Sequence, residues 1–390
     1  MSWEKKTLDQ LGSISRGKSK HRPRNDPKLF GGQYPFIQTA DVKNANFYIT
    51  EYSDTYNETG LAQSKLWDVG TLCITIAANI ADTGILGIPA CFPDSVMGFI
   101  PYDGVSDVRF VKYCFDMLQR DCKQISQGTA QDNLSWQKLS TIEFPVPPIE
   151  TQRRIADILS AYDDLIENNR KQIKLLEEAA QRLYKEWFVD LRFPGHEHTK
   201  IVDGVPEGWE KQPLSSIADI RMGQSPKSEF YNQIGEGLPF HQGVGSYGNR
   251  FVRDETYSTS FTRIAEAGSI LFSVRAPVGR LNITKNKIVI GRGIAALNHK
   301  SRLQSFLFYM LKERFFKDNL VGNGSIFASI SKEELLNQQF IIPCEDIMVQ
   351  YDKAAQNIDD RIATLDRQTE LLTQARDRLL PKLMSGEVEV

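Results

Sequence analysis

Histidine and cysteine are scarce in this sequence, with five of each among 390 residues. The cysteines are spread over the chain and form no C-x-x-C pair: Cys73, Cys91, Cys114, Cys122 and Cys344. This scarcity excludes the usual zinc-finger spacings and a disulfide framework. It favours a reducing compartment, so we expect a cytoplasmic protein in which each cysteine is a small core residue.

Motifs of catalytic sites are missing as well. Gly12-x-x-x-x-Gly17-Lys18-Ser19 has the spacing of a Walker phosphate loop, but residues 16–28 are a basic segment rich in Gly and Pro, so we expect a loop there and not the helix that a Walker site requires. The Asn/Asp-Pro-Pro-aromatic motif of base amino-methylation is absent, because Pro147-Pro148 is flanked by Val146 and Ile149. No Asp followed by an Asp/Glu-x-Lys pair stands out as a nuclease site. The sequence therefore predicts a protein that is not itself an enzyme.

Two short motifs leave alternatives open. Residues 243–248 have the pattern G-x-G-x-x-G of a dinucleotide-binding loop, but residues 249–253 do not begin an apolar-periodic helix. We expect a flexible glycine loop there. His196-Glu197-His198 has the residue types of a metal site, yet it follows Pro194-Gly195, which is typical of a solvated linker. We expect neither a metal nor a cofactor in this chain.

An excess of charge of either sign is also absent. Lysine and arginine number 47 against 49 aspartates and glutamates, so any binding to nucleic acid must come from local clusters. Long hydrophobic runs are missing too, because Asp82 and several glycines and prolines interrupt residues 69–93. Residues 1–6 have no apolar segment typical of a secretory signal. We expect no contact with a membrane.

What the sequence does contain is one long internal repeat. Trp3-Glu4-Lys5 recurs as Trp209-Glu210-Lys211, and Gly17-x-Ser19 recurs as Gly223-x-Ser225. Pro35-Phe36-x-Gln38 matches Pro239-Phe240-x-Gln242, and near the end of each half the offset settles at 196 residues. The sequence therefore predicts that one ancestral unit was duplicated.

The last part of each half has apolar residues at alternating spacings of four and three. The two series begin with Ile155, Leu159, Tyr162 and Ile166, and with Tyr351, Ala355, Ile358 and Ile362. This pattern predicts two coiled-coil helices of about 33–36 residues, each roughly 50 Å long. The simplest way to bury both apolar seams is for the two helices to pack against each other, antiparallel, within the chain.

We therefore predict an α+β fold in which two repeated, mixed α/β globular domains are joined by an antiparallel intramolecular coiled coil. β-rich runs at 70–76 and 268–274, and short helices near 108–119 and 303–319, are expected within the globular domains. The predicted segments are a globular domain at 1–148, a helix at 149–190, a linker at 191–208, a globular domain at 209–345 and a helix at 346–385.

Positive charge gathers locally in both halves. Residues 16–28 hold six Lys/Arg against one Asp, and residues 221–300 hold eleven Lys/Arg against five Asp/Glu. Residues 41–110 are acidic, so DNA binding in the first half must be confined to the 16–28 loop and a few neighbours. Lysine and arginine suit phosphates, and Arg, Gln and Ser suit base edges. The candidate DNA-binding residues are Arg16, Lys18, Ser19, Lys20, Arg22, Arg24, Gln38, Gln224, Ser225, Arg250, Arg253, Arg275, Arg280 and Arg292.

This ordered set of features resembles the specificity (S) subunits of type I restriction–modification enzymes over essentially the whole chain. The resemblance implies that each globular domain is a target recognition domain reading half of a split, asymmetric sequence in double-stranded DNA. It implies that the helices set the gap between half-sites and bind two methyltransferase (M) subunits, with restriction (R) subunits joining for cleavage. S-adenosylmethionine, ATP and Mg²⁺ would then belong to those partners.

A second hypothesis treats the chain as a coiled-coil scaffold that binds only proteins. Charge reversal in the 16–28 loop would distinguish the two hypotheses. A DNA reader should lose affinity and salt dependence, because both depend on basic residues, whereas a protein scaffold should be unaffected.

Overall fold

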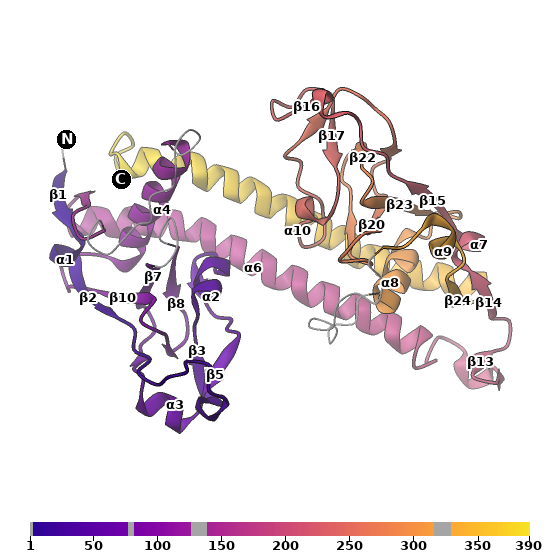
Figure 1. Cartoon of the computed structure of the whole chain (residues 1–390), viewed down its shortest axis with the longest axis horizontal. Coiled ribbons are helices and arrows are strands. Elements are labelled where there is room, and N and C mark those ends of the chain that lie inside the picture. Colours follow the sequence, from indigo (N-terminus) through magenta and orange to yellow (C-terminus); the bar gives the residue numbers. More distant parts are fainter. Residues whose placement is uncertain (1–2, 77–81, 126–138, 316–328) are drawn as a thin grey trace. The chain divides into compact units, whose positions relative to one another are not determined.

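The computed structural model describes residues 3–76, 82–125, 139–315 and 329–390 (Figure 1). They belong to two compact units. The first unit comprises Met1–Lys171 and Leu365–Val390, and the second comprises Gln172–Thr364. Each unit contains one globular domain and about half of each long helix, so the division between the units crosses both helices.

The first unit is built from short strands and helices. In chain order they are β1 (Glu4–Thr7), α1 (Leu8–Leu11), β2 (Gly12–Arg16), η1 (Pro27–Leu29), β3 (Phe30–Phe36), α2 (Thr39–Asn44), β4 (Tyr48–Ile49), β5 (Asp54–Tyr56), α3 (Glu58–Ala62), β6 (Leu66–Trp67), β7 (Leu72–Thr75), β8 (Thr83–Leu86), β9 (Ala90–Cys91), β10 (Val96–Pro101), α4 (Val108–Ile125) and β11 (Glu143–Val146). The long helix α6 (Ile149–Phe188) follows directly.

These strands form a five-stranded sheet in the order β2-β10-β7-β8-β4, a four-stranded sheet in the order β5-β3-β9-β6, and the pair β1-β11. Most neighbouring strands are antiparallel, but β4 with β8 and β3 with β9 are parallel. The run predicted at 70–76 contains β7, whose four residues are all buried. Helix α4 confirms the helix predicted near 108–119, and its side chains Phe110, Val111 and Phe115 are fully buried.

The second unit has a similar series of elements, and its last helix continues from it into the first unit. They are η2 (His196–His198), β12 (Ile201–Val202), β13 (Val205–Pro206), β14 (Glu210–Pro213), α7 (Leu214–Ile217), β15 (Ala218–Met222), η3 (Ser228–Phe230), β16 (Tyr231–Asn232), β17 (Leu238–His241), η4 (Val244–Ser246), β18 (Tyr257–Ser258), β19 (Ile264–Ala265), β20 (Ile270–Ser273), β21 (Leu281–Ile283), β22 (Ile288–Ile290), β23 (Ile294–His299), α8 (Gln304–Phe315), α9 (Lys332–Leu336), β24 (Gln339–Ile342) and α10 (Glu345–Met384).

Much of the sheet topology of the first unit recurs in the second, which also has a five-stranded sheet in the order β16-β18-β17-β22-β19. The order β15-β23-β20-β21 matches β2-β10-β7-β8, and β14-β24 matches β1-β11. The register is the same as well: Glu4 pairs with Val146, and Glu210 pairs with Ile342. A duplicated sequence has therefore kept its strand pairing, as the repeat predicted. Helix α8 is apolar on all sides and its residues 305–311 are buried, as predicted; the predicted residues 316–319 lie outside the described part of the chain.

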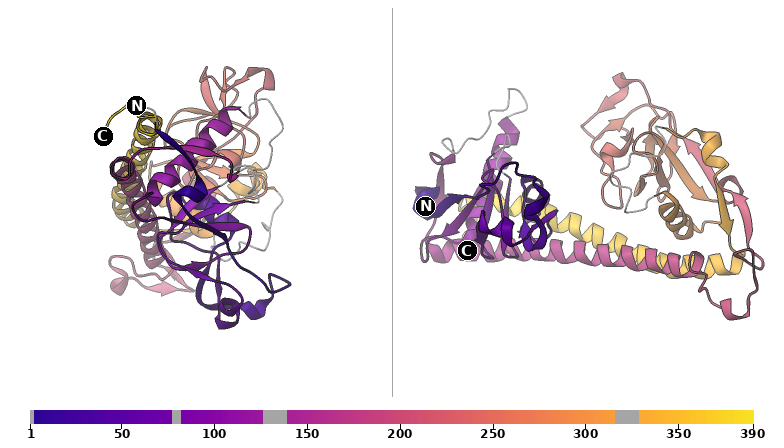
Figure 2. Two further views of the ribbon diagram at one scale, coloured as in Figure 1. Left: turned by 90° about the vertical axis from the view of Figure 1, so that its left-hand side faces the viewer. Right: turned by 60° about the horizontal axis from the view of Figure 1, so that its bottom comes forward.

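Helices α6 and α10 are each one continuous helix of 40 residues, somewhat longer than predicted. They run antiparallel and side by side within each unit (Figures 1 and 2). In the first unit Asp163 of α6 forms an ion pair with Arg376 of α10. In the second unit the Tyr351 hydroxyl donates to the carbonyl oxygen of Ala180 at 3.2 Å. The predicted contact between the two heptad stretches is therefore confirmed.

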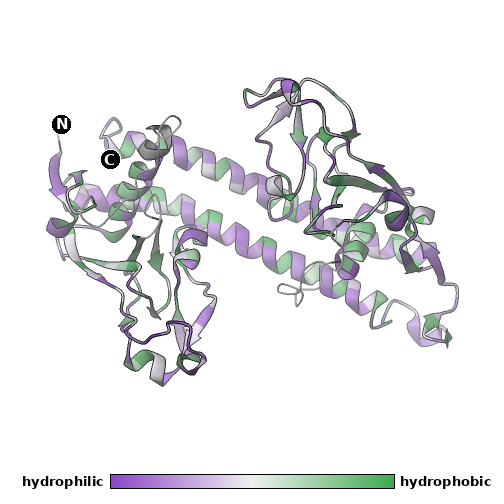
Figure 3. Ribbon diagram, viewed as in Figure 1, coloured by the Kyte–Doolittle hydropathy of each residue, from purple (hydrophilic) through white to green (hydrophobic). Residues whose placement is uncertain are grey.

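Each globular domain shares its hydrophobic core with both helices. In the first unit Ile155 and Leu159 of α6, together with Leu383 of α10, pack in one cluster with α4 and the sheet. In the second unit Tyr184 and Tyr351 belong to the corresponding cluster with α8. Figure 3 shows green apolar turns alternating with purple polar ones along both helices. The apolar seams thus hold each domain on the helix pair.

Cys73, Cys91 and Cys114 are buried, as predicted for small core residues, and Cys344 is half-buried. The side chain of Cys122 lies outside the described residues. Burial raises the pKa of the Cys73 and Cys114 thiols well above the ordinary value, so both stay protonated. In the described ranges, no helix combines the length and apolar character needed to cross a membrane.

Candidate nucleic-acid interface

The Gly-x-Ser turn of the first unit is held by main-chain hydrogen bonds. The Gly17 amide donates to the Val96 carbonyl at 2.8 Å, and the Lys18 amide donates to the Phe92 carbonyl at 3.0 Å. A Cβ atom on Gly17 would lie 2.3 Å from the carbonyl oxygen of Pro93. Because real Cβ atoms essentially never approach so closely, the turn requires glycine at this position.

The second unit repeats this arrangement. The Gly223 amide donates to the Ile294 carbonyl, and the Gln224 amide donates to the Ile290 carbonyl, both at 2.9 Å. A Cβ atom on Gly223 would lie 2.2 Å from the carbonyl oxygen of Gly291. The glycine of the motif is thus explained by close backbone approach, which the sequence alone did not reveal.

The matched glutamines lie beside these turns. Gln38 follows strand β3, where the Ile37 amide donates to the Cys91 carbonyl at 2.8 Å. Gln242 follows strand β17, and its carbonyl accepts from the Gly293 amide at 3.0 Å. Strands β3 with β9, and β17 with β22, are parallel, so their carboxyl ends meet at one edge. In each unit the Gly-x-Ser turn, the glutamine and the loop following β9 or β22 therefore converge. We call this place the motif edge.

Basic side chains surround the motif edge of the first unit. Arg16, Lys18 and Lys20 are exposed. The Arg22 guanidinium donates to the carbonyl oxygens of Ser19 and His21, both at 2.7 Å. Across the described ranges, Lys18, Lys20 and Arg22 form no ion pair with a carboxylate. These three cations therefore remain available to an external anion.

A cavity of about 350 Å³ opens at this edge. Its lining includes Ser19, Arg24 and Gln38, three of the predicted DNA-binding residues, together with the aromatic rings of Phe30 and Phe36. The buried Ser19 hydroxyl has no hydrogen-bond partner among the described residues. A buried hydroxyl without a partner is costly, so this group is suited to bind a polar atom that enters the cavity.

Two acidic residues complete the polar surface of this cavity region. The Gln38 side-chain amide donates to the Asp54 carboxylate at 2.6 Å, and Arg24 forms an ion pair with Asp94 at 2.6 Å. The acidic character of residues 41–110 thus extends to the motif edge, where it orients Gln38 and Arg24. Sequence reasoning missed Asp54 and Asp94, because their partners are distant in the chain.

The motif edge of the second unit has different side chains. Gln242 and Arg275 line a cavity of about 160 Å³ together with Gly243, Val244 and Ser273. The Arg292 amide donates to the Ser225 hydroxyl at 3.2 Å, so the Arg292 backbone lies next to the Gly-x-Ser turn. Arg275, Arg292 and Gln224 are exposed. Three predicted arginine and glutamine positions therefore meet at this edge or border it.

Arg250 is a correction to the predicted set. Its side chain is 3% exposed, and the guanidinium donates to Asp359 at 2.5 Å and to the Tyr309 hydroxyl at 3.2 Å. The same group lies 3.9 Å from the ring centre of Phe308. The prediction of an exposed DNA contact was wrong, because Arg250 joins the globular domain to α10 instead. Burial opposes its charge, but Asp359 and neighbouring groups raise its pKa above the ordinary value.

Two further arginines lie away from the motif edge. Arg280 lines a separate cavity of about 360 Å³ together with Glu177 and Lys312. Arg253 is exposed, and its amide donates to the Ser246 carbonyl at 2.9 Å. Neither residue lines the Gln242 cavity, and whether they touch DNA stays a prediction.

The G-x-G-x-x-G segment is an irregular loop in the structure. It contains the short 3-10 turn η4, and Tyr247 forms an isolated bridge with Val252 where a dinucleotide site would have its helix. His241, buried to 1% exposure, lies beneath it, with Nδ1 2.8 Å from Ser246 Oγ and Nε2 3.0 Å from Asp254 Oδ1. The hydrogen bond with His241 lowers the pKa of Asp254 despite partial burial.

Comparison with known proteins decides the family. The model of the type I restriction modification DNA specificity domain matches residues 1–178 and 206–380. The chain belongs to this family. Both copies of the predicted repeat are thereby recognised as specificity domains. The matched ranges include the motif edges and much of both long helices.

Individual relatives agree with this assignment. A type I restriction enzyme MjaIX specificity subunit of Methanocaldococcus jannaschii is 27% identical and covers 100% of this chain and 94% of its own. A putative MjaX specificity subunit of the same organism is 34% identical over 67% of this chain, and the match spans 62% of that relative. The crystal structure of a type I S subunit from Mycoplasma genitalium covers 98% of this chain and 96% of its own, with a TM-score of 0.60 and 17% identity, which supports the fold.

Proposed function

We propose that this specificity protein reads a bipartite, asymmetric DNA sequence, with one motif edge for each half-site. The observation that carries the proposal is the convergence of the same motifs in both units, where exposed cations surround a polar cavity. Membership of the family of type I DNA specificity domains supports it.

In the first unit we assign different tasks to the two kinds of side chain. Lys18, Lys20 and Arg22 are exposed cations, and we expect them to bind phosphates without regard to sequence. Gln38 and the Ser19 hydroxyl line the cavity, and we expect them to meet a base edge. The Asp54 carboxylate holds the Gln38 amide in one orientation, which leaves the Gln38 carbonyl oxygen to accept a hydrogen bond from a base.

In the second unit we assign base reading to Gln242 and Arg275, which line one cavity. Arginine binds the N7 and O6 acceptors of guanine with two hydrogen bonds. The first unit offers Arg24 at its cavity instead, already paired with Asp94. Because the two cavities differ in size and in polar groups, the two half-sites are expected to differ in sequence.

The chemistry of modification and cleavage is assigned to other subunits. We propose that two methyltransferase subunits bind to the helix pair, and that restriction subunits join them. On this proposal S-adenosylmethionine, ATP and Mg²⁺ bind to those partners. In the described ranges no cluster of three or more His, Cys, Asp or Glu side chains forms that could hold a metal ion.

The decisive experiment measures DNA affinity against salt concentration for the complex of this chain with its methyltransferase partner. The target sequence is first obtained by mapping modified bases across the host genome. The double variant Lys18→Glu/Lys20→Glu should bind at least tenfold more weakly, with a salt slope shallower by about two, since each phosphate contact contributes about 0.9.

The matched control is Lys5→Glu/Lys211→Glu, which makes the same change of charge at exposed positions of β1 and β14. Its affinity and salt slope should equal those of the unaltered complex. Equal DNA binding by both double variants would contradict the proposal and favour the protein-only scaffold.

A further inference from the structure

The two long helices end in the same way. The Arg192 amide donates to the Glu186 carbonyl after α6, and the Val388 amide donates to the Lys382 carbonyl after α10. The two donors are 196 residues apart, as are the two acceptors, which is the offset of the repeat. Phe193 of the second unit therefore corresponds to Glu389 of the first unit.

In the second unit Phe193 fills a pocket beside the helix end. Its side chain is 3% exposed, and its ring centre lies 4.9 Å from that of Trp209. Ile347 belongs to the same buried cluster, and the half-buried Cys344 packs against it. An aromatic side chain from an irregular segment thus closes this end of the second unit.

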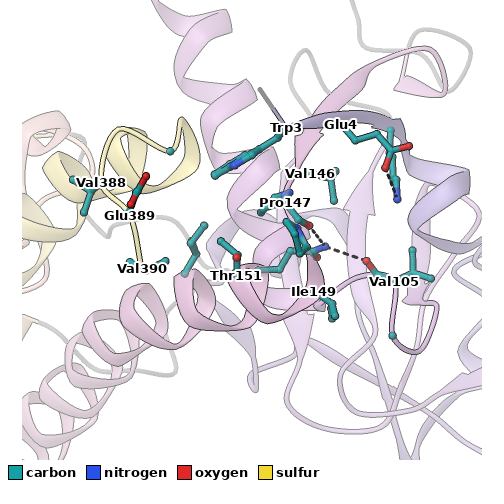
Figure 4. A pocket seen from close by; sticks show the side chains of 16 residues that line it. Trp3, Glu4, Val105, Val146, Pro147, Ile149, Thr151, Val388, Glu389 and Val390 are labelled. Atoms are coloured by element: carbon teal, nitrogen blue, oxygen red, sulfur yellow. Dashed lines mark hydrogen bonds and ion pairs between the residues drawn. The ribbon is translucent and has the colours of Figure 1, made fainter. Parts of the chain in front are cut away.

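The first unit keeps the tryptophan but has no aromatic plug among its described residues; the partly buried Val390 packs against the core cluster here and lines the remaining space. Trp3 corresponds to Trp209, and Pro148 stands in place of Cys344. Smaller or more polar residues replace the other three: Thr151 for Ile347, Gln152 for Met348, and Ile155 for Tyr351. Glu389 is exposed where Phe193 is buried. A cavity of about 720 Å³ lies here (Figure 4), lined by Trp3, Val105, Pro147, Thr151, Val388 and Glu389 among others.

The walls of this cavity call for an apolar occupant. The Gln152 amide donates to the carbonyls of Val105 and Pro147, at 3.0 and 2.9 Å, and its oxygen accepts from the Asp107 amide at 3.2 Å. The hydrogen-bonding groups of Gln152 are therefore paired within the protein and do not require a polar group on a ligand. Trp3 and the valines and prolines around it present apolar surface, which is stabilised by burial.

The negative charge at the rim of the cavity indicates that a basic residue flanks the bound side chain. Glu4 is neutralised by Lys6 at 3.1 Å, whereas no described residue forms an ion pair with Glu389. The rim therefore has an excess of negative charge. In the second unit the buried Phe193 is preceded by Arg192 and followed by Pro194. A cation next to the aromatic ring would complement the Glu389 carboxylate.

We propose that the cavity beside Trp3 is a docking site for an aromatic side chain, flanked by a basic residue and proline, on an irregular segment of a partner protein. A second copy of this chain is a poor donor, because its own Phe193 is 3% exposed and removing it would open that unit's core. The proposal is independent of DNA reading, since the cavity shares no lining residue with the motif-edge cavity of the same unit.

A peptide with the sequence of residues 190–199 tests the proposal, because it carries Arg192, Phe193 and Pro194 in their natural order. The full chain is labelled with 5-fluorotryptophan, and the Trp3 signal is assigned by its loss in Trp3→Phe. Fluorine NMR should show a saturable shift of the Trp3 signal on addition of the peptide. The same peptide with Phe193→Ala should produce none. No saturable shift, or equal shifts with both peptides, would overturn the proposal.

The variant Glu389→Phe supplies the missing ring within the chain. It should abolish the peptide-induced shift of Trp3 and raise the melting temperature by a few degrees. The matched control is Glu387→Phe, which makes the same change at an exposed position that does not line the cavity. The control should keep the peptide response. A Glu389→Phe variant that binds the peptide as well as the control would contradict the assigned position of the ring.

Discussion

A buried carboxylate in the first unit and a half-buried one at the equivalent position of the second join each globular domain to the helix pair. Asp163 accepts from the Tyr113 hydroxyl at 2.5 Å, and Asp359 accepts from the Tyr309 hydroxyl at 2.7 Å. Each carboxylate also pairs with an arginine: Arg376 of α10 in the first unit, and Arg250 of the globular domain in the second. Burial raises the pKa of Asp163, and Arg376 opposes that rise. The two units thus have the tyrosine at equivalent positions, but the arginine that pairs with the carboxylate comes from a different element in each.

This arrangement predicts a large effect of Arg250→Ala. Truncation leaves the Asp359 carboxylate half-buried and without its guanidinium, and such losses cost about 3–5 kcal/mol. Urea unfolding followed by circular dichroism measures the change. The control is Arg253→Ala at an exposed position, which should shift stability by less than about 0.5 kcal/mol. A similar small shift for Arg250→Ala would mean that the ion pair between Arg250 and Asp359 does not hold the domain.

Gln38 carries a prediction about specificity. Gln38→Ala removes the amide that Asp54 orients, so the first unit should tolerate an additional base at one position of its half-site, with about 1–3 kcal/mol less discrimination. Mapping of methylated sites in cells that carry the variant reads out this change. Gln33→Ala, an exposed change on β3 away from the cavity, is the control and should leave the target unchanged. An unaltered target with Gln38→Ala would remove this residue from base reading.

Residue patterns indicated some of these roles and missed others. Gly-x-Ser and the matched glutamines were visible as repeated positions, and both units bring them together. Arg250 was misassigned because its charge partner, Asp359, is 109 residues away and belongs to a helix. An arginine that pairs across the fold cannot be told from a surface arginine by local composition. The Asp54 and Asp94 contacts, with partners 16 and 70 residues away, were hidden for the same reason.

At the scale of elements, α6 and α10 were the most predictable parts of the fold. Their periodic apolar residues continue over several turns, so the pattern is redundant and single exceptions do not obscure it. The short strands of the globular domains lack this redundancy, and many of them have two to four residues. Their pairing depends on contacts distant in sequence, which is why the sequence indicated few of them, among them the buried strands β7 and β20.

The helices carry a prediction about the spacer between half-sites. Seven residues inserted into both helices, after Lys171 and after Thr364, lengthen each by about 10 Å and keep the pairing within each unit. The spacer between half-sites should then lengthen by about three base pairs, at 3.4 Å per base pair, while both half-sites keep their sequences. Methylome mapping measures both quantities. A spacer of unchanged length would refute the role of the helices as a ruler.

At the scale of the molecule, the duplication assigns one half-site to each unit. Replacing residues 209–345 with the corresponding domain of another family member should change one half-site and leave the other as it was. The same residues returned to their original sequence are the control for the cloning junctions. Simultaneous change of both half-sites in the modified genome would show that the units do not read DNA separately.

The anchoring of the Gly-x-Ser turns has a consequence for how such proteins diverge. Gly17 and Gly223 are fixed by carbonyl and amide groups and by the space that a missing Cβ leaves, whichever side chains project from the surrounding loops. Substitution of those loop side chains should therefore leave the main-chain structure of the turns unchanged. On the proposed function, a lineage could acquire a new recognition sequence through a few substitutions at one motif edge, without rebuilding the fold.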